Sequence, residues 1–203
     1  MATALAPPAT AAPSKRTPSS ASSIVASKPP CTIDSTALIA DKALLTGTHP
    51  VTIGAKAVVH PYARIRAEGG PVTIGDFCTI AENAVVGLPA DVAGEVVLEG
   101  WVSVGSGAEV MAVRVGEGSE IGVQARIGAS AVLGRFSKVT ALEGVEGEGR
   151  VEDFGVVFAG GGRRADGSMK GNEEMRALRL KGQEKLGEVA RRLVADGKAK
   201  WMG

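Results

Sequence analysis

Aromatic residues are scarce in this chain. Only 3% of its 203 residues are Phe, Trp or Tyr, although 44% are hydrophobic. A core must therefore be filled by Val, Ile, Leu and Ala rather than by rings. Such a composition, together with 28 glycines, is unusual for a globular domain and indicates a repetitive architecture.

Three other features are also lacking. The 23 basic and 22 acidic residues leave a formal charge of +1, so neither nucleic acid nor an anionic membrane surface is favoured as a partner. No apolar run reaches the length of about 18 residues that membrane insertion requires. The two cysteines, Cys31 and Cys78, form no CxxC pair, so we expect neither a disulfide framework nor a zinc cluster, and a reducing compartment is the default.

What the chain does contain is an aliphatic residue at every sixth position. In residues 51–70, "VTIGAKAVVHPYARIRAEGG", these are Ile53, Val59 and Ile65. Small residues such as Ala57 and Ala63 usually follow four places after an aliphatic residue. Glycine often follows one place after it. The series of aliphatic positions runs Ile33, Ile39, Leu45, Ile53, Val59, Ile65, Ile74, Ile80, Val86, Leu98, Val104, Val110, Val115, Ile121, Ile127, Leu133, Val139, Val145, Val151 and Val157.

This pattern is the hexapeptide repeat of a parallel β-helix. Each hexad is one short strand and one turn, and three hexads make a triangular coil. Aliphatic residues then stack in columns inside a prism too narrow for rings. The small residue also faces inward, and the glycine after the aliphatic residue is expected to supply a left-handed backbone conformation at the corner. We predict an all-β fold, a left-handed parallel β-helix of about seven triangular coils, followed by a C-terminal α-helix.

The interruptions of the repeat support a three-sided coil. Steps longer or shorter than six residues follow only Leu45, Ile65, Val86 and Val110, each at the end of a third hexad. Every interruption is therefore predicted to fall at the same corner of the prism. The longest, "GLPADVAGEV" at residues 87–96, is expected to project there as a loop, either functional or merely tolerated.

The sequence divides into four segments. Residues 1–30 are rich in Ala, Pro and Ser and predict a disordered tail, with a mitochondrial transit peptide as the alternative. Residues 31–160 are the β-helix, and residues 161–171 are a linker. The basic turn "GGGRR" at residues 160–164 is interpreted as a hinge into the helix that follows. A β-helix leaves strand edges open at its ends, so we expect the tail or a neighbouring subunit to cover one end.

Residues 172–196 predict a helix, with Asn172 as N-cap and Arg191 and Arg192 near the end. Two internal glycines, Gly182 and Gly187, weaken it as a free helix by about 1 kcal/mol each, so it needs a surface to lie on. Its apolar residues recur at helical spacing: Met175, Leu178, Leu186, Val189, Leu193 and Val194.

Four aromatic residues share one place in the repeat. Each is the fourth residue of a hexad that opens a coil, which predicts one column along an outer edge of the prism: Phe77, Trp101, Phe136 and Phe154. Scattered surface rings are the simpler interpretation, but a shared position favours a covered patch. We expect the C-terminal helix or a partner subunit to lie over it.

The sequence does not carry the catalytic motifs of the enzymes with this architecture. A zinc carbonic anhydrase needs three protein ligands, usually histidines from neighbouring coils, and this chain has only His49 and His60. Hexapeptide acyltransferases use a histidine as general base, but both histidines precede proline at turns, where an exposed turn residue is the simpler interpretation. No GxSxG, Walker or HExxH motif is present. We therefore predict no catalytic residue, no metal site and no cofactor.

The motifs do resemble one family. The stretch "VTIGAKAVVHPYARIRAEGGPVTIGDFCTIAENAVV" is similar to the opening coils of the small β-helical subunits at the pointed end of the dynactin complex, and "VFAGGGRR" to the step before their C-terminal helix. The resemblance covers roughly residues 31–195. The long first segment and a shorter, less acidic loop at 87–96 depart from the family. The matching positions of the central motif are His60, Pro61, Ala63, Arg64, Ile65, Ala67, Glu68, Gly70 and Pro71.

This resemblance implies a non-catalytic subunit in the cytoplasm, on the cytoskeleton. Its implied partners are the sister β-helical subunit and the pointed-end actin-related protein, and indirectly dynein and its adaptors on microtubules. His60, Arg64 and Glu68, with the four aromatic residues, are the candidate partner contacts. The rival hypothesis is a hexapeptide-repeat enzyme, a gamma-type carbonic anhydrase or an acyltransferase, which would form a symmetric homotrimer. A generic β-helical binding module is the third.

Overall fold

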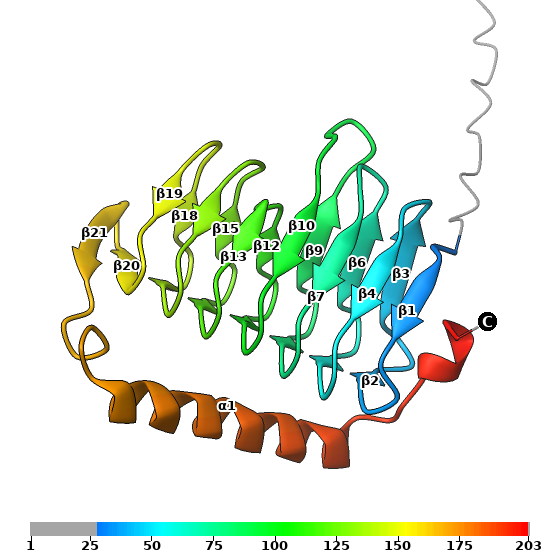
Figure 1. Ribbon diagram of the computed structural model, residues 1–203. Coiled ribbons are helices and arrows are strands. Elements are labelled where there is room, and N and C mark those ends of the chain that lie inside the picture. The colour runs from blue at the N-terminus through cyan, green and yellow to red at the C-terminus, as the bar shows by residue number, and fades with distance from the viewer. Residues whose placement is uncertain (1–27, 203) are drawn as a thin grey trace, which may run out of the picture.

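Each hexad forms one short strand and one turn, and three consecutive strands pass once around a triangular prism (Figure 1). The computed structural model of the chain describes residues 28–202. The predicted tail, residues 1–30, lies outside the described residues except for 28–30.

Each side of the prism is one sheet, and its strands come from successive coils. The first sheet contains β1 (Cys31–Ile33), β4 (Val51–Ile53), β7 (Val72–Ile74), β10 (Val96–Leu98), β13 (Arg114–Val115), β16 (Val132–Leu133) and β19 (Arg150–Val151). The second contains β2 (Leu38–Ile39), β5 (Val58–Val59), β8 (Thr79–Ile80), β11 (Ser103–Val104), β14 (Glu120–Ile121), β17 (Lys138–Val139), β20 (Gly155–Phe158) and β21 (Gly162–Ala165). The third contains β3 (Leu44–Gly47), β6 (Arg64–Ala67), β9 (Val85–Leu88), β12 (Glu109–Val110), β15 (Arg126–Ile127) and β18 (Gly144–Val145).

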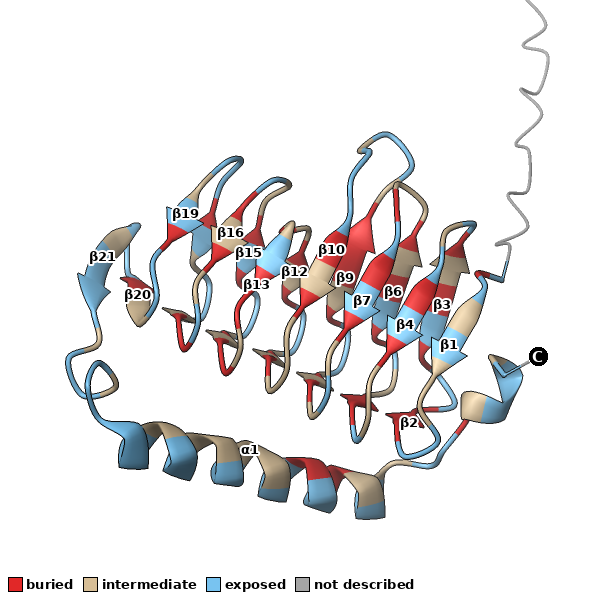
Figure 2. Ribbon diagram, in the orientation of Figure 1, coloured by how far each residue is buried: buried red, intermediate tan, exposed pale blue. Residues whose placement is uncertain are grey.

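The aliphatic positions of the repeat stack in register, as predicted. In the first sheet Ile53 pairs with Ile74, and Ile74 with Leu98, and all three side chains are buried. Figure 2 shows these buried positions along the successive coils of the prism, although β1 and β21 have none. The small residues point inward as well. Two of these inward residues are serines. Their buried hydroxyl groups are hydrogen-bonded to each other, since Ser137 Oγ donates to Ser119 Oγ at 3.0 Å.

Apart from Gly87, at φ 120°, the glycines directly after the aliphatic residues do not have the predicted positive φ. The left-handed positions lie two residues later, in the turn itself, and include Phe77 at φ 57° and Asn83 at φ 58°. Gly75 instead allows the turn of the next coil to approach closely, because glycine has no Cβ atom. A Cβ atom there would lie 2.7 Å from the carbonyl carbon of Glu99 in the next coil. The glycines are therefore required by the close approach of stacked turns.

All interruptions of the repeat fall at the corner between the third and first sheets, as predicted. They follow β3, β6, β9 and β12, which are neighbouring strands of the third sheet. The longest is the loop between β9 and β10, which rises from this corner in Figure 1. Its Val92 side chain is partly buried against the core, so the loop folds back on its own base.

The prism has six complete coils in residues 28–202, and β19 and β20 begin a seventh that does not close. Gly160 and Gly161, at φ 74° and 78°, reverse the chain, so that β21 pairs antiparallel with β20. Both glycine N–H groups donate to the Glu143 carboxylate of the coil before. The segment expected as a linker, residues 161–171, therefore contains a strand that ends the second sheet.

The C-terminal helix α1 (Glu173–Leu193) begins at the predicted N-cap, where the Asn172 side chain accepts from Met175 N–H. It runs back along the second sheet from the last coil toward the first (Figure 1). Polar groups hold it there: Arg179 contacts Glu120 at 3.1 Å, and Gln183 contacts Ser103 at 3.2 Å. Near its end, Ala190 packs on Leu38 and Val58. Among the described residues no helix has the length and hydropathy needed to cross a membrane.

The chain then returns to the first coil and covers part of its open end. Asp196 bridges to Ala40, and Gly197 N–H donates to Ile39 O at 2.7 Å. The short 3₁₀ helix η1 (Lys198–Lys200) follows, and the Trp201 ring packs against the core. The expectation that the N-terminal tail or a neighbouring subunit covers one end of the prism stays a prediction, and the sequence pattern does not indicate this contact of the last residues.

Candidate functional site

The corner between the first and second sheets is built from turn residues in the left-handed conformation. Each donates its N–H to the preceding coil: Phe77 to Ala55 O at 2.8 Å, and Trp101 to Asp76 O at 2.8 Å. Because this backbone ladder repeats at the spacing of the coils, the side chains at the fourth hexad position are held one above another. We call this column of fourth hexad positions the aromatic ladder. It contains Lys56, Phe77, Trp101, Gly118, Phe136 and Phe154.

The four aromatic rings stack in this ladder as two separate pairs. Phe77 and Trp101 lie nearly parallel with ring centroids 4.5 Å apart, and Phe136 and Phe154 lie nearly parallel at 5.9 Å. Gly118 occupies the place between the pairs, and a Cβ atom there would lie 2.7 Å from the Phe136 ring. The predicted column therefore exists, but a glycine divides it.

Helix α1 lies beside both ring pairs. Lys56 Nζ is 4.8 Å from the Phe77 ring centroid and 3.2 Å from the Glu184 carboxylate of α1. At the other end of the column, the Arg176 guanidinium lies 5.7 Å from the Phe154 ring. None of the four rings is fully exposed. The rings thus stack within the chain's own helix–prism contact, and their contact with another subunit remains a prediction.

The other three candidate residues lie elsewhere, on one coil. His60 is in the turn between the second and third sheets, Arg64 begins β6 on the third sheet, and Glu68 follows the end of β6. Arg64 is exposed, whereas Glu68 accepts a hydrogen bond from Thr46 Oγ1 at 3.1 Å. The three residues therefore follow one side of the prism from His60 to Glu68, and the aromatic ladder lies at the opposite corner, between the first and second sheets.

The two histidines are held by their turns. His60 N–H donates to Ile80 O at 2.9 Å, and His49 Nδ1 lies 3.1 Å from Ala67 O. Partial burial lowers the pKa of His60, and the nearby Glu82 partly offsets this effect. Within residues 28–202 no three His, Cys, Asp or Glu side chains come together in a way that could hold a metal ion.

The two cysteines are reduced and far apart. Cys78 is buried, and its thiol donates to Glu99 O at 2.9 Å. Burial raises the pKa of Cys78 to about 12. The neutral thiol is therefore the stable form at physiological pH, and this residue fills the small inward position of its hexad.

One feature of α1 could not be anticipated from its pattern. Of the apolar residues at helical spacing, Val194 packs against the prism, whereas Met175, Leu178, Leu186, Val189 and Leu193 are all exposed. The inward positions are instead occupied by Arg176, Arg179, Gln183, Gly187, Ala190 and Val194. The apolar stripe was visible in the sequence, but its direction was not.

Comparison with known proteins gives two kinds of similarity. The chain is 34% identical over 119 residues to a protein of Nematostella vectensis named dynactin subunit 6, a match that covers 53% of this chain and 64% of the relative. It is 58% identical over 36 residues to the Danio rerio protein of the same name, covering 18% of each. The matches thus span less than two thirds of either relative. No family model matches the chain.

Among solved structures, a hexapeptide transferase family protein from Anaplasma phagocytophilum is similar with a TM-score of 0.65 and 20% identity, covering 79% of this chain and 91% of that one. Similarity at this level concerns the fold. The predicted left-handed β-helix of hexapeptide repeats with a C-terminal helix is confirmed. The two relatives support the resemblance to pointed-end dynactin subunits that the sequence motifs predicted.

Proposed function

We propose that this chain is a non-catalytic structural subunit of the dynactin pointed-end complex. The observation that carries the proposal is the similarity to dynactin subunit 6 over 119 residues. In this role it pairs with the sister β-helical subunit and contacts the pointed-end actin-related protein. Indirectly, it supports the engagement of dynein and its adaptors on microtubules. The chain then works in the cytoplasm on the cytoskeleton, without a cofactor.

The prism has the surfaces that such a role needs. Helix α1 lies along the second sheet, so the outer faces of the first and third sheets stay open along residues 28–202. The first sheet is nearly uncharged over its early coils, where Thr32, Thr52 and Thr73 pair in register and are exposed. Charged residues are depleted in the centres of protein interfaces. This stretch is therefore our preferred face for the sister subunit, and Arg64 and Glu68 on the third sheet side are the preferred second contact.

Affinity purification from native extract tests this proposal. The tagged chain is expected to recover dynactin subunits, including the actin-related protein and the sister subunit, as identified by mass spectrometry. Thr52→Lys on the first sheet should reduce recovery of the sister subunit several-fold. Arg126→Glu, at an exposed position of the third sheet, is the control and should leave recovery of the sister subunit unchanged. The proposal would be refuted if the tagged chain recovered no dynactin subunit.

A second candidate function follows from the fold similarity to a hexapeptide transferase family protein. An enzyme of this kind would assemble as a homotrimer and would use His49 or His60 as a base or metal ligand. Metal analysis, carbon dioxide hydration and acetyl-CoA consumption by the purified chain test this candidate. On the dynactin proposal all three measurements give background values, and they stay at background in His60→Gln.

A further inference from the structure

Helix α1 presents its apolar stripe sideways, along one flank, rather than toward the prism. Met175, Leu178, Leu186, Val189 and Leu193 follow one another at intervals of three, eight, three and four residues, so they share one face of the helix. They are 38% to 80% exposed. Large apolar side chains gathered in a row on a surface indicate an interaction site.

A groove lies between this flank and the second sheet. Its wall on α1 includes Gly182 and Leu186, its floor includes Gly105 and Gly122, and its far rim includes Val123. The groove has a volume of about 450 Å³. Gly182 leaves room on the wall for the side chains of an incoming segment, because a Cβ atom there would meet nothing within 4 Å. The floor at Gly105 and Gly122 is closed by stacked backbone.

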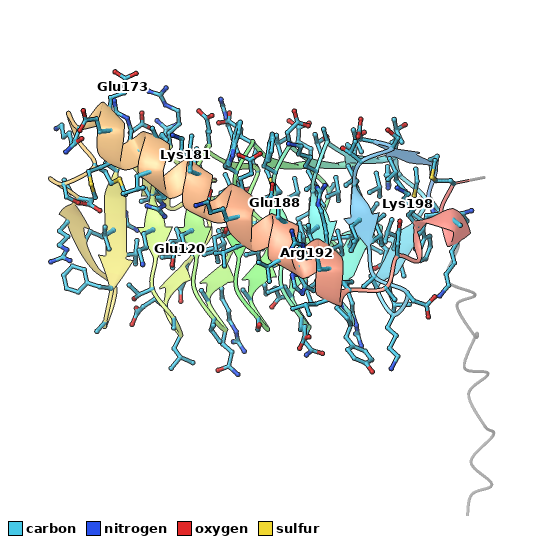
Figure 3. The ribbon with its side chains drawn as sticks, turned by 90° about the horizontal axis from the view of Figure 1, so that it is seen from below. Glu120, Glu173, Lys181, Glu188, Arg192 and Lys198 are labelled. Atoms are coloured by element: carbon cyan, nitrogen blue, oxygen red, sulfur yellow. The ribbon has the colours of Figure 1, made fainter. Side chains whose placement is uncertain are left out.

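The rim continues the apolar surface beyond the groove. Val123 is half exposed, and the N–H of Leu142, in the next coil, donates to Val123 O at 2.9 Å. Leu142 is one of the most exposed large apolar residues described. Figure 3 shows that α1 crosses the second sheet obliquely, so the strands beside its first half are not covered. The groove is therefore open along the side where Leu178 and Leu186 stand.

The shape of this surface fits one more helix. The stripe on α1 runs from Met175 to Leu193, a rise of about 27 Å, which corresponds to about five helical turns. A helix laid in a groove anchors through residues at i, i+3 or i+4, and i+7. Such a helix could place apolar anchors against Leu178, Leu186 and Val189, while its own outer side remains in solvent.

The charges beside the stripe determine the preferred chemistry of the partner. Lys181 and Lys185 lie one turn apart on the solvent side of the stripe, and both are exposed. Neither has an ion pair within residues 28–202, whereas Arg179, on the inner side, is already paired with Glu120. Acidic side chains on the incoming helix would therefore gain partners at Lys181 and Lys185.

A second copy of the chain fits this surface poorly. Its α1 is attached to its own prism, so that its stripe could reach the groove only if the two helix-covered faces came together. The outward face of each α1 carries charged residues of both signs, among them Lys181, Glu188 and Arg192 (Figure 3), and all of them would lose water in such a contact. Charged residues are depleted in the centres of protein interfaces.

We propose that the groove between α1 and Val123 binds an amphipathic helical segment of a different protein, with apolar anchors facing Leu178 and Leu186 and acidic residues facing Lys181 and Lys185. This site does not depend on the dynactin assignment. It is distinct from the aromatic ladder, which lies at the other corner of the second sheet.

Binding of designed peptides to the full chain tests the proposal. The probe is a fluorescein-labelled helical peptide of about 18 residues with a leucine stripe at helical spacing and glutamates on one flank. The control peptides carry lysines in place of the glutamates, or the same composition in scrambled order. By fluorescence anisotropy, the acidic peptide is expected to bind at least ten-fold more tightly than either control.

Two variants locate the bound peptide. Leu186→Asp should weaken binding of the acidic peptide at least ten-fold, whereas Leu44→Asp, on the exposed side of the third sheet, should leave it unchanged. The double variant Lys181→Glu with Lys185→Glu should favour the lysine peptide instead. Equal effects of Leu186→Asp and Leu44→Asp, or no binding by any peptide up to its solubility limit, would overturn the proposal. So would a wild-type dimer, seen by analytical ultracentrifugation, that Leu186→Asp dissociates.

Discussion

At the residue scale, the repeat depends on positions where backbone from the next coil leaves no room for a side chain. Gly75 is one of these, and Gly122 is another, where a Cβ atom would lie 2.4 Å from Ala141 N. By contrast, Gly107 lies in the left-handed turn position that Asn83 and Gln124 occupy in other coils. Glycine is thus obligatory at the first kind of position and replaceable at the second.

This difference predicts that one glycine substitution destabilises the fold and another does not. Gly75→Ala should lower the free energy of unfolding by about 1–3 kcal/mol, because the methyl group must displace the backbone of Glu99. Gly107→Asn should change it by no more than about 0.5 kcal/mol, since it is exposed and asparagine tolerates the left-handed conformation. Thermal or chemical denaturation measures both. Similar losses for the two variants would contradict this explanation of the glycines.

His60 predicts a pH dependence of stability. Burial lowers the pKa of His60 in the folded chain, so the unfolded chain binds the proton more readily. Stability should therefore decrease as the pH falls below the unfolded pKa of about 6.5, until the folded imidazole is itself protonated. Denaturation of His60→Gln measured over the same pH range should show a shallower decrease. An identical decrease in the variant would show that another group is responsible.

At the element scale, α1 is held by polar contacts along its length and by one small apolar contact near its end. The rise of one helical turn, about 5.4 Å, is close to the strand spacing of about 4.8 Å. Residues three or four apart on α1 can therefore meet successive coils, as Arg179 does at Glu120 and Gln183 at Ser103. This match explains how a helix with two glycines follows the prism without burying its apolar stripe.

The contact of Ala190 should be essential for docking of α1. Ala190→Glu would place a charge against Leu38 and Val58, and burial of an unpaired carboxylate is costly. We expect faster hydrogen exchange throughout α1 and faster proteolysis in residues 166–171. Ala177→Glu, an exposed change in the same helix, is the control and should leave both rates unchanged. Equal protection in the two variants would show that the helix is held by its polar contacts alone.

At the scale of the whole molecule, the chain is a stiff prism whose first coil is partly closed by its own C-terminus. Gly197 comes so close to the first coil that a Cβ atom there would lie 2.4 Å from the Cα atom of Asp41. Lys198 Nζ also donates to Ala37 O at 3.2 Å. These contacts occupy backbone groups that an open coil would offer to another strand.

Removing residues 195–203 should therefore promote association. Ile39 O and Asp41 N would lose their partners, and the first coil would be open to edge-to-edge pairing. Size-exclusion chromatography with light scattering is expected to show larger species than for the full chain. Removal of residues 202–203 alone should leave the size unchanged, because the contacts of residues 196–201 are kept. A truncated chain of unaltered size would show that this segment does not protect the first coil.

Much of this architecture was determined by the sequence alone. Inward aliphatic residues must return at a fixed interval when a chain is wound on a narrow prism, and interruptions can occur only at a corner. The spacing therefore predicted the β-helix, the shared corner of the interruptions, the C-terminal helix and the stacking of Phe77 with Trp101 at one edge. These features depend on a period, which a linear sequence displays directly.

The tertiary structure decided the features that depend on direction and on contacts between distant segments. The spacing of Leu178, Leu186 and Val189 shows that they share a face of α1, but only docking determines where that face points. The return of Gly197 to Asp41 joins residues from opposite ends of the described chain, and no local pattern marks it. The reason in both cases is physical: rotation about a helix axis and long-range contacts are set by the packed surface, which the sequence does not display.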